Sequence, residues 1–327
     1  MKFIDLHCDT LLHLNTNSTD TLLQNKFSVD FKRMKDSGCL AQFFAIFPLP
    51  QEGLAEPYFK GIHQEMVGTF IEEKFTIFYR DIAKSDNVNL ALNVKDVVQN
   101  EKEGKSSAFL SIENGLQIKG NLNVLYDYYI KGVRLITLVW NSKNSLGSPC
   151  SKNSNIMKEG LSTLGKKVIE EMNSLGMIID VSHLSDGGFW DVVNISKKPF
   201  IASHSNCRDL VPNPRNLSND MIKKLSDLGG VIGLNFEPTF LNQNTKDTHS
   251  TINAIIHNAK HMRKYGGIDV IAIGSDLDGT SGTLEIDSTH KIPNLLEALA
   301  KNGFTYNEID KISKNNVLRV MRDVFDY

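Results

Sequence analysis

The sequence lacks the features that mark several large classes of protein. Its four cysteines, Cys8, Cys39, Cys150 and Cys207, have no short paired spacing, which excludes a zinc ribbon or a CxxC redox site and makes reduced thiols the default. No apolar run reaches about 18 residues, so we expect no transmembrane helix. No basic segment followed by an apolar one precedes the first expected strand, so no signal peptide is visible. The sequence therefore predicts a cytoplasmic protein without a membrane partner.

Charge of one sign is also lacking. The 327 residues include 36 Lys and Arg against 38 Asp and Glu, a formal net charge of -2. No dense basic stripe is present, so nucleic acid is excluded as a partner and small molecules are expected instead. No low-complexity linker or internal repeat divides the chain, which predicts a single barrel domain over residues 1–327. Whether the chain forms a homodimer stays open.

Eight apolar runs, each too continuous for a strand with one exposed face, are present instead. Strands that are buried on both faces have this pattern, and alternation with helices implies parallel pairing. The runs cover residues 3–5, 41–47, 108–112, 134–139, 177–181, 200–202, 231–235 and 270–274. Helical patterns cover residues 60–83, 161–175, 189–196, 220–228, 250–265, 292–301 and 306–325.

This alternation predicts a TIM-like (β/α)₈ barrel with C-terminal helices. Ser162 and Asp220 are the expected helix caps, and Gly176 and Gly266 lie where helices should end. A doubly wound sheet is the alternative, but no glycine-rich fingerprint follows the first strand.

Metal-binding side chains follow five of the expected strands. In such barrels the chemistry lies at the carboxyl ends of the strands. His7 and Asp9 are two residues apart, so they share a face if the first strand continues through Asp9. Together they form a chelating pair for a divalent metal such as zinc. The other strand ends supply Glu113, His183, His204 and Asp276.

Three histidines and three carboxylates exceed what one zinc ion needs, since a hydrolytic zinc takes three protein ligands and keeps one open position. A two-metal site needs a carboxylate that spans both ions. Glu113 is the natural bridge, shared by one zinc with His7 and Asp9 and a second zinc with His183 and His204. Taken singly, each residue is equally well explained as a hydrogen-bonded group at a barrel mouth, but the recurrence at five strand ends favours metal.

Two further residues are assigned from their positions. Asp276 directly follows the last strand and should face the metals, whereas Asp278 lies at a turn with Gly279, where Asp commonly bonds nearby backbone. We therefore assign Asp276 as the proton-handling carboxylate. Arg215 lies in a proline-bracketed loop after the sixth strand, and its planar fork suits recognition of a carboxylate. A surface arginine packed on the loop is the alternative, and position alone does not decide.

These segments together resemble the membrane (renal) dipeptidase family of zinc dipeptidases. The similar segments are residues 4–9, 111–115, 132–138, 160–165, 179–183, 203–205, 215–217 and 274–279, so the resemblance covers essentially the whole chain. It implies a barrel of the metal-dependent hydrolase type and two zinc ions bridged by Glu113. The other implied ligands are His7, Asp9, His183 and His204. Arg215 is implied as a substrate-binding residue, and Asp276 as the catalytic and substrate-contacting aspartate.

The activity that the resemblance implies is hydrolysis of free dipeptides, including those with a C-terminal D-amino acid, by attack of a metal-bridging hydroxide. One residue departs from the family. The renal enzymes follow the fourth strand with a histidine near the substrate carbonyl, whereas this sequence has Trp140. An indole can line the substrate pocket and donate a hydrogen bond, but it cannot act as an acid.

Two alternatives remain. One is another metal-dependent amidohydrolase on the same barrel. Many cyclic amidohydrolases begin with two histidines around one residue and bridge their metals with a modified lysine, whereas this chain has His7 with Asp9, and Glu113. The other is a catalytically inactive binding protein, which the loss of a metal ligand would have favoured. All five ligands are present.

Overall fold

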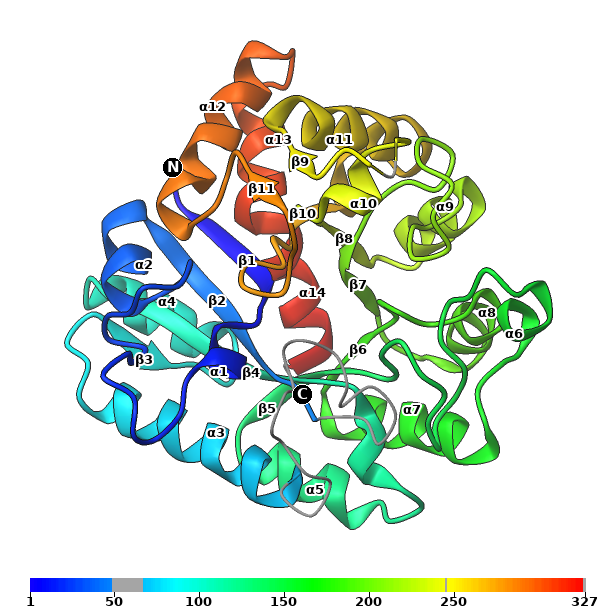
Figure 1. Cartoon of the computed structure of the whole chain (residues 1–327), viewed down its shortest axis with the longest axis horizontal. Helices are drawn as coiled ribbons and strands as arrows, with labels where there is room; N and C mark the ends of the chain where they lie inside the picture. Colours follow the sequence, from blue (N-terminus) through cyan, green and yellow to red (C-terminus); the bar gives the residue numbers. More distant parts are fainter. Residues whose placement is uncertain (49–66, 245, 326–327) are drawn as a thin grey trace.

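The computed structural model describes residues 1–48, 67–244 and 246–325. Eight parallel strands form the closed barrel in the order β2-β1-β10-β8-β7-β6-β5-β4, and β2 pairs with β4 to complete it (Figure 1). Their bounds are β1 Phe3–Cys8, β2 Cys39–Ile46, β4 Ser106–Glu113, β5 Val133–Thr137, β6 Ile178–Asp180, β7 Ile201–Ser205, β8 Val231–Leu234 and β10 Ile271–Ile273. Each coincides with one of the eight predicted runs, so the predicted barrel is confirmed.

Shorter strands lie outside this ring. β3 (Val88–Leu90) pairs with the beginning of β4 and was not predicted. β9 (His249–Ser250) and β11 (Thr283–Leu284) form a separate two-stranded sheet.

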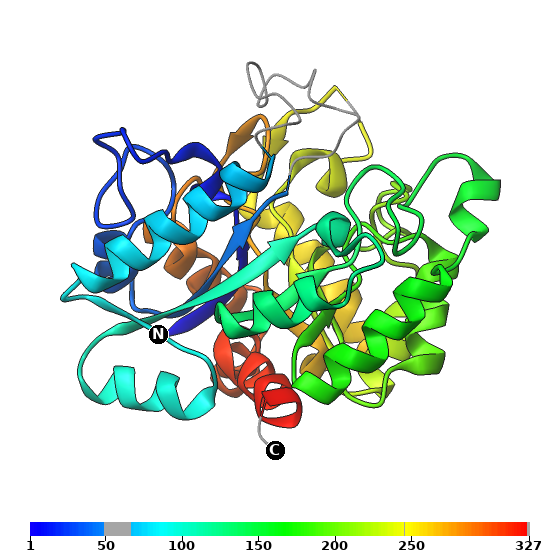
Figure 2. The ribbon, with the colours of Figure 1, turned by 90° about the horizontal axis from the view of Figure 1, so that it is seen from below.

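Helices surround the barrel and connect its strands (Figures 1 and 2). The longer ones are α2 Phe31–Ser37, α3 Val67–Ala83, α4 Val94–Lys102, α5 Asn123–Ile130, α7 Thr163–Leu175, α8 Asp186–Ile195, α9 Asn219–Asp227, α11 Ile252–Gly266, α12 Ile292–Lys301 and α14 Asn316–Phe325. The short ones are α1 Thr10–His13, α6 Ser154–Lys158, α10 Pro238–Leu241 and α13 Tyr306–Asp310. Among the described residues, no helix combines the length and the apolar character that a membrane span requires.

The helix predictions hold with local corrections. Ser162 caps α7 by accepting the Gly165 amide, and Gly176 ends that helix at a positive φ of 70°. Asp220 is not a cap, because Ser218 accepts the Met221 amide and α9 begins one residue earlier. Helix α11 ends at Gly266, as predicted, and Gly267 follows it at a positive φ of 78°.

Two predicted helices differ in extent. The helix expected over 306–325 is interrupted by a π-helical turn at Lys311–Asn315. The helix expected over 60–83 is seen from residue 67, and residues 60–66, with His63, lie outside the described residues.

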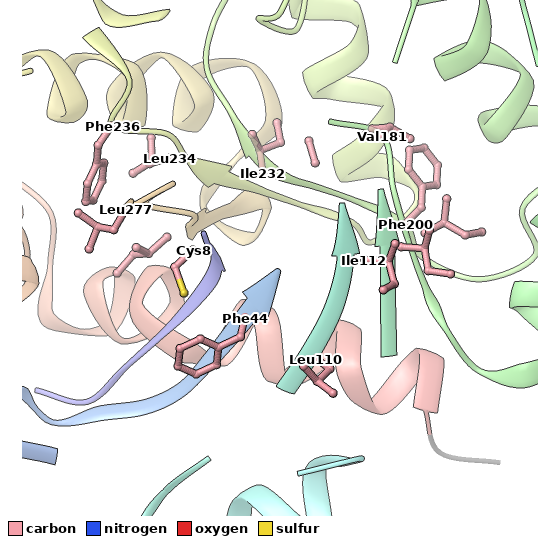
Figure 3. Packing of buried hydrophobic residues seen from close by; sticks show 14 of the residues in the cluster. Cys8, Phe44, Leu110, Ile112, Val181, Phe200, Ile232, Leu234, Phe236 and Leu277 are labelled. Atoms are coloured by element: carbon pink, nitrogen blue, oxygen red, sulfur yellow. The ribbon is translucent and has the colours of Figure 1, made fainter. Parts of the chain in front are cut away.

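Two apolar clusters hold the barrel together. The larger one lies between the strands and the surrounding helices, and Figure 3 shows Phe44, Leu110, Ile232 and neighbouring side chains from it. The smaller cluster joins residues from all eight barrel strands to the apolar face of α14. Several of these residues begin their strands, so α14 closes the amino-terminal end of the barrel (Figure 2). The carboxyl ends of the strands are therefore left for the site.

Candidate metal centre

The six predicted side chains meet at the carboxyl ends of the strands. Three of them lie within barrel strands: His7 in β1, Glu113 at the end of β4 and His204 in β7. The other three follow strands: Asp9 comes directly after β1, His183 three residues after β6 and Asp276 three residues after β10. The premise for the first pair was wrong, because β1 ends at Cys8 and Asp9 is the residue before α1. Its carboxylate Oδ2 nevertheless lies 3.2 Å from His7 Nε2.

Glu113 lies between two sets of donor atoms. Its Oε1 is 3.0 Å from His183 Nε2 and 3.5 Å from His204 Nε2, whereas its Oε2 is 3.6 Å from His7 Nε2. The groups His7–Asp9–Glu113 and Glu113–His183–His204 each keep their ligand atoms within 4.8 Å of one another. Glu113 therefore belongs to both groups, with a different oxygen facing each one.

Hydrogen bonds on the far side of two imidazoles define which nitrogen faces the site. His183 Nδ1 lies 2.9 Å from Asn141 Oδ1, an acceptor, so Nδ1 carries the proton. His204 Nδ1 lies 2.7 Å from Ser203 Oγ, whose own proton is donated to Asp180 Oδ2 at 2.6 Å. Both Nε2 atoms are thus free of protons, and they lie 3.2 Å apart. Two nitrogen lone pairs and a Glu113 oxygen therefore face one another with no proton between them. Such an arrangement is stabilised by a bound cation.

Because the cluster is buried, keeping its carboxylates ionised costs free energy unless a cation is bound beside them. Burial raises the pKa of Asp276 well above its usual range, with a further contribution from the neighbouring carboxylates Asp9 and Glu113. Burial would also raise the pKa of Glu113, but the neighbouring histidines, His7 first, outweigh it and hold that pKa well below its usual range. Burial and the Arg215 guanidinium lower the pKa of His183 to about 4. The lowered value keeps this imidazole neutral, as a metal ligand must be.

The space beside these groups also fits an ion. Asp9 Oδ1 is buried and has no hydrogen-bond partner among the described residues. Gly279 lies against the carboxylates of Asp9 and Asp276, and any side chain there would collide with both. The absent Cβ therefore leaves room for the two carboxylates to turn inward. The donor types, the shared Glu113 and this space together fit a pair of divalent cations.

The two aspartates after β10 face different ways. Asp276 Oδ2 accepts a 2.9 Å hydrogen bond from Asn235 Nδ2, and its Oδ1 lies 3.8 Å from His7 Nε2. Asp278 instead accepts hydrogen bonds from Thr10 Oγ1 at 2.5 Å and from the Ser28 amide at 2.9 Å. Asp276 faces the cluster of candidate metal ligands, whereas Asp278 connects α1 and the segment around Ser28.

A cavity of about 440 Å³ opens over the cluster. Its wall includes Asp9, Glu113, His183, Asp276, Arg215 and Trp140. The three predicted substrate-binding residues, Arg215, Trp140 and Asp276, therefore lie in the same cavity as candidate metal ligands. This volume falls within the range of about 300–1,000 Å³ that is typical of small-molecule sites.

Arg215 is buried in this wall with most of its donors unused. Its side chain donates to Ser205 Oγ at 2.9 Å from Nη1, whereas Nε and Nη2 are buried and have no partner among the described residues. Only 5% of Arg215 is exposed. A surface arginine packed on its loop is therefore ruled out. Two unpaired donors on a buried cation are suited to an incoming carboxylate.

Trp140 lies on the side of the cavity that contains His183. Its ring centroid is 6.2 Å from the His183 ring and 4.8 Å from the ring of Phe47, which it meets edge to face. The indole thus limits the cavity beside a candidate metal ligand. The neighbouring Asn141, which orients His183, was not singled out in the sequence.

Comparison with known proteins gives a consistent result. A family model described as membrane dipeptidase, peptidase family M19, matches residues 1–327. Dipeptidase tcpJ of Claviceps purpurea is 29% identical over 300 residues, covering 91% of this chain and 69% of that protein. Dipeptidase aclJ of Aspergillus oryzae is 30% identical over 305 residues, covering 90% of this chain and 70% of that protein.

The fold also has a close structural counterpart. The crystal structure of a metallopeptidase from Rhodobacter sphaeroides, liganded with a phosphinate mimic of the dipeptide L-Ala-D-Ala, superimposes with a TM-score of 0.87. It is 23% identical, and the superposition covers 99% of this chain and 99% of that one.

Proposed function

The chain belongs to the membrane dipeptidase family, peptidase family M19, and from this premise we propose that it hydrolyses free dipeptides at a binuclear zinc centre. The family is one of metal-dependent dipeptidases, and the number and identity of the ions are our proposal. The observation that carries it is the convergence of two proton-free imidazole nitrogens, from His183 and His204, on one side of Glu113 and of the His7 imidazole and the Asp9 carboxylate on the other. Imidazole and carboxylate ligands in sets of three suit zinc with an open position.

In this proposal His7, Asp9 and Glu113 would hold one ion, and Glu113, His183 and His204 would hold the other. Bound zinc would polarise the scissile carbonyl and make a water acidic enough to act as the nucleophile. The protein's contribution is to hold the ligands in place, with Asn141 and Ser203 fixing the two imidazoles from behind.

Asp276 is the proposed proton carrier. Asn235 holds one of its oxygens, and the other faces the cluster, so the carboxylate can take a proton from the attacking water and pass it to the leaving amine. Burial raises its pKa, which suits a group that must hold a proton between accepting it and releasing it.

Arg215 is the proposed receptor for the C-terminal carboxylate of the substrate. A carboxylate on its two unpaired donors and a peptide carbonyl at the metal cluster would fix both ends of one residue, so a longer C-terminal extension should not fit. We also propose that the cavity accepts a D residue at this position. The ligand of the Rhodobacter protein makes L-Ala-D-Ala the first substrate to test.

The test combines metal analysis with a substrate panel. The purified chain is stripped with a chelator, reloaded with zinc and assayed with L-Ala-D-Ala, L-Ala-L-Ala, a tripeptide and a cyclic amide. Two zinc equivalents with hydrolysis of the dipeptides alone support the proposal. Zinc with activity only on the cyclic amide would assign a cyclic amidohydrolase instead, and a metal-free, inert protein would assign a binding protein.

A further inference from the structure

Arg215 is carried by a loop that is closed at its base. The loop leaves β7 and returns to it, because Cys207 and Leu217 form a bridge between the two ends. The Leu217 amide donates to Asn206 O at 2.9 Å, and the Arg208 amide donates to Leu217 O at 2.8 Å. Arg208 therefore begins the loop near the point where the loop ends.

The side chain of Arg208 crosses the loop to the backbone on both sides of Arg215. Its Nε donates to the carbonyl of Asn216 at 2.8 Å, and its Nη2 donates to the carbonyl of Pro214 at 3.2 Å. These two residues flank Arg215 in the sequence. One guanidinium thus holds the peptide group immediately before the residue that faces the cavity and the peptide group one residue beyond it.

A carboxylate fixes this guanidinium from outside the loop. Asp186, in the first turn of α8, accepts two parallel hydrogen bonds from Arg208, at 2.7 Å from Nη1 and 2.8 Å from Nη2. Such paired bonds define the orientation of the planar group as well as its position. The Arg208 and Asp186 side chains are 23% and 32% exposed, so the pair is partly buried and lies behind the cavity wall.

We propose that Arg208, held by Asp186, is a positioning residue that pre-orients Arg215 for the C-terminal carboxylate of the substrate; this inference rests on the proposed function of Arg215. Among the described residues the buried Arg215 guanidinium has one hydrogen-bond partner, Ser205, and lies 5.5 Å from the centre of the Phe240 ring, so its direction also depends on the backbone that carries it. A binding group held in its productive orientation loses less entropy when the ligand arrives. Only the planar fork of arginine reaches a carboxylate and two carbonyls at once, which a lysine cannot do.

The test compares a dipeptide with its C-terminal amide. In the full-length, zinc-loaded enzyme, kcat/KM is measured for L-Ala-D-Ala and L-Ala-D-Ala amide, and the ratio reports carboxylate recognition alone. Arg208→Lys and Arg208→Met should lower this ratio by roughly 10- to 100-fold, mainly by raising KM for the free acid. The reason is that displacing a binding group by about 1 Å can lower the rate by about 100-fold. Asp186→Asn should lower it in the same direction by a smaller factor.

Arg263 offers a matched control outside the cavity wall. Arg263 forms an ion pair with Glu308 at 3.2 Å and stacks on Phe304, and it takes no part in the cavity wall. Arg263→Met removes a comparable arginine and should leave the ratio at the wild-type value.

Equal losses on the acid and the amide in the Arg208 and Asp186 variants would mean a purely structural role and would overturn the inference. If the Arg208 variants do not fold, Asp186→Asn decides alone, since it keeps the arginine and removes only the charge that holds it. The carboxylate assignment of Arg215 would be refuted if wild type cleaved the acid and the amide with nearly equal kcat/KM and Arg215→Met did not change this ratio. The proposed role of Arg208 would then be refuted as well.

Discussion

Replacing Glu113 with glutamine tests the binuclear centre most directly. The two carboxylate oxygens face different histidines, with Oε1 at 3.0 Å from His183 Nε2 and Oε2 at 3.6 Å from His7 Nε2. Glutamine keeps the shape of the side chain but presents one neutral oxygen and one amide group. The amide nitrogen is a donor and cannot bind a cation. One metal position therefore loses its shared ligand, and the other keeps a weaker one.

The size of the effect follows from burial. Glu113 is only 4% exposed, so its charge is poorly screened by water. Removing one partner of a buried ion pair costs about 3–5 kcal/mol. Since about 1.4 kcal/mol corresponds to a tenfold change in affinity, the zinc dissociation constant at the position that faces the amide should rise roughly 100- to 3,000-fold.

The assay is elemental analysis after zinc loading and removal of unbound metal. Wild type should retain two equivalents, and Glu113→Gln should retain one or fewer. Glu237→Gln is the matched control, because Glu237 lines the same cavity but belongs to none of the candidate metal groups among the described residues. Two tightly held equivalents in Glu113→Gln would refute the bridging role. Equal losses in both variants would mean that total cavity charge, and not a bridge, retains the metal.

The other predictions concern the remaining groups in the cavity. Asp276→Asn should keep both metals but lower kcat by about 100-fold or more, and a near-normal Asp276→Asn beside an inactive Asp278→Asn would reverse the two roles. Arg215→Met and amidation of the substrate should each cost about 2–5 kcal/mol in transition-state binding, and less than their sum when combined; efficient cleavage of amidated dipeptides or tripeptides would contradict this. Trp140→Phe should lower kcat/KM if the indole N–H contacts the transition state, and an unchanged value would leave the ring a packing role. Zinc affinity should rise with pH. Burial raises the pKa of Asp276, and the carboxylates beside His7 raise the pKa of that imidazole despite its burial, so both groups hold protons that must leave when zinc binds. Calorimetry in buffers of different ionisation enthalpy counts these protons, and finding none released would be the contrary result.

The barrel could be predicted because its strands are buried on both faces. Such strands are near-continuous apolar runs, and the eight runs correspond to the eight strands of the ring. β3 was missed because it has three residues, two of them only partly buried. The break in the last helix was also missed, since Lys311–Asn315 has no proline or glycine to signal a π-helical turn.

The candidate ligands could be predicted because histidines and carboxylates at strand ends are conspicuous in a sequence. The residues that orient them are less so. Asn141 and Asn235 are uncharged amides in loops and after strands, where such residues are common, and only the fold brings them to His183 and Asp276. Asp180 was the one such residue with a signal, since it is an ionisable group inside an apolar run. It accepts hydrogen bonds from two hydroxyls and two amides, on which the position of two strand ends depends.

The choice between the two aspartates after β10 shows where strand alternation stops being informative. Asp276 and Asp278 both have left-handed backbone conformations, with φ of 61° and 69°, so neither continues the strand, and alternation does not predict where their side chains point. Their hydrogen-bond donors differ instead. Both oxygens of Asp278 accept hydrogen bonds from other segments, one from Thr10 in α1 and one from the Ser28 amide, whereas Asp276 receives one donor, from Asn235, and keeps an oxygen toward the cluster. Asp278 thus uses both oxygens to connect neighbouring segments of the chain. Asp276 keeps one oxygen directed at the cluster, and this oxygen is available for the proposed proton transfer. The donors that the fold brings to each aspartate therefore favour Asp276, and not Asp278, as the proposed proton carrier.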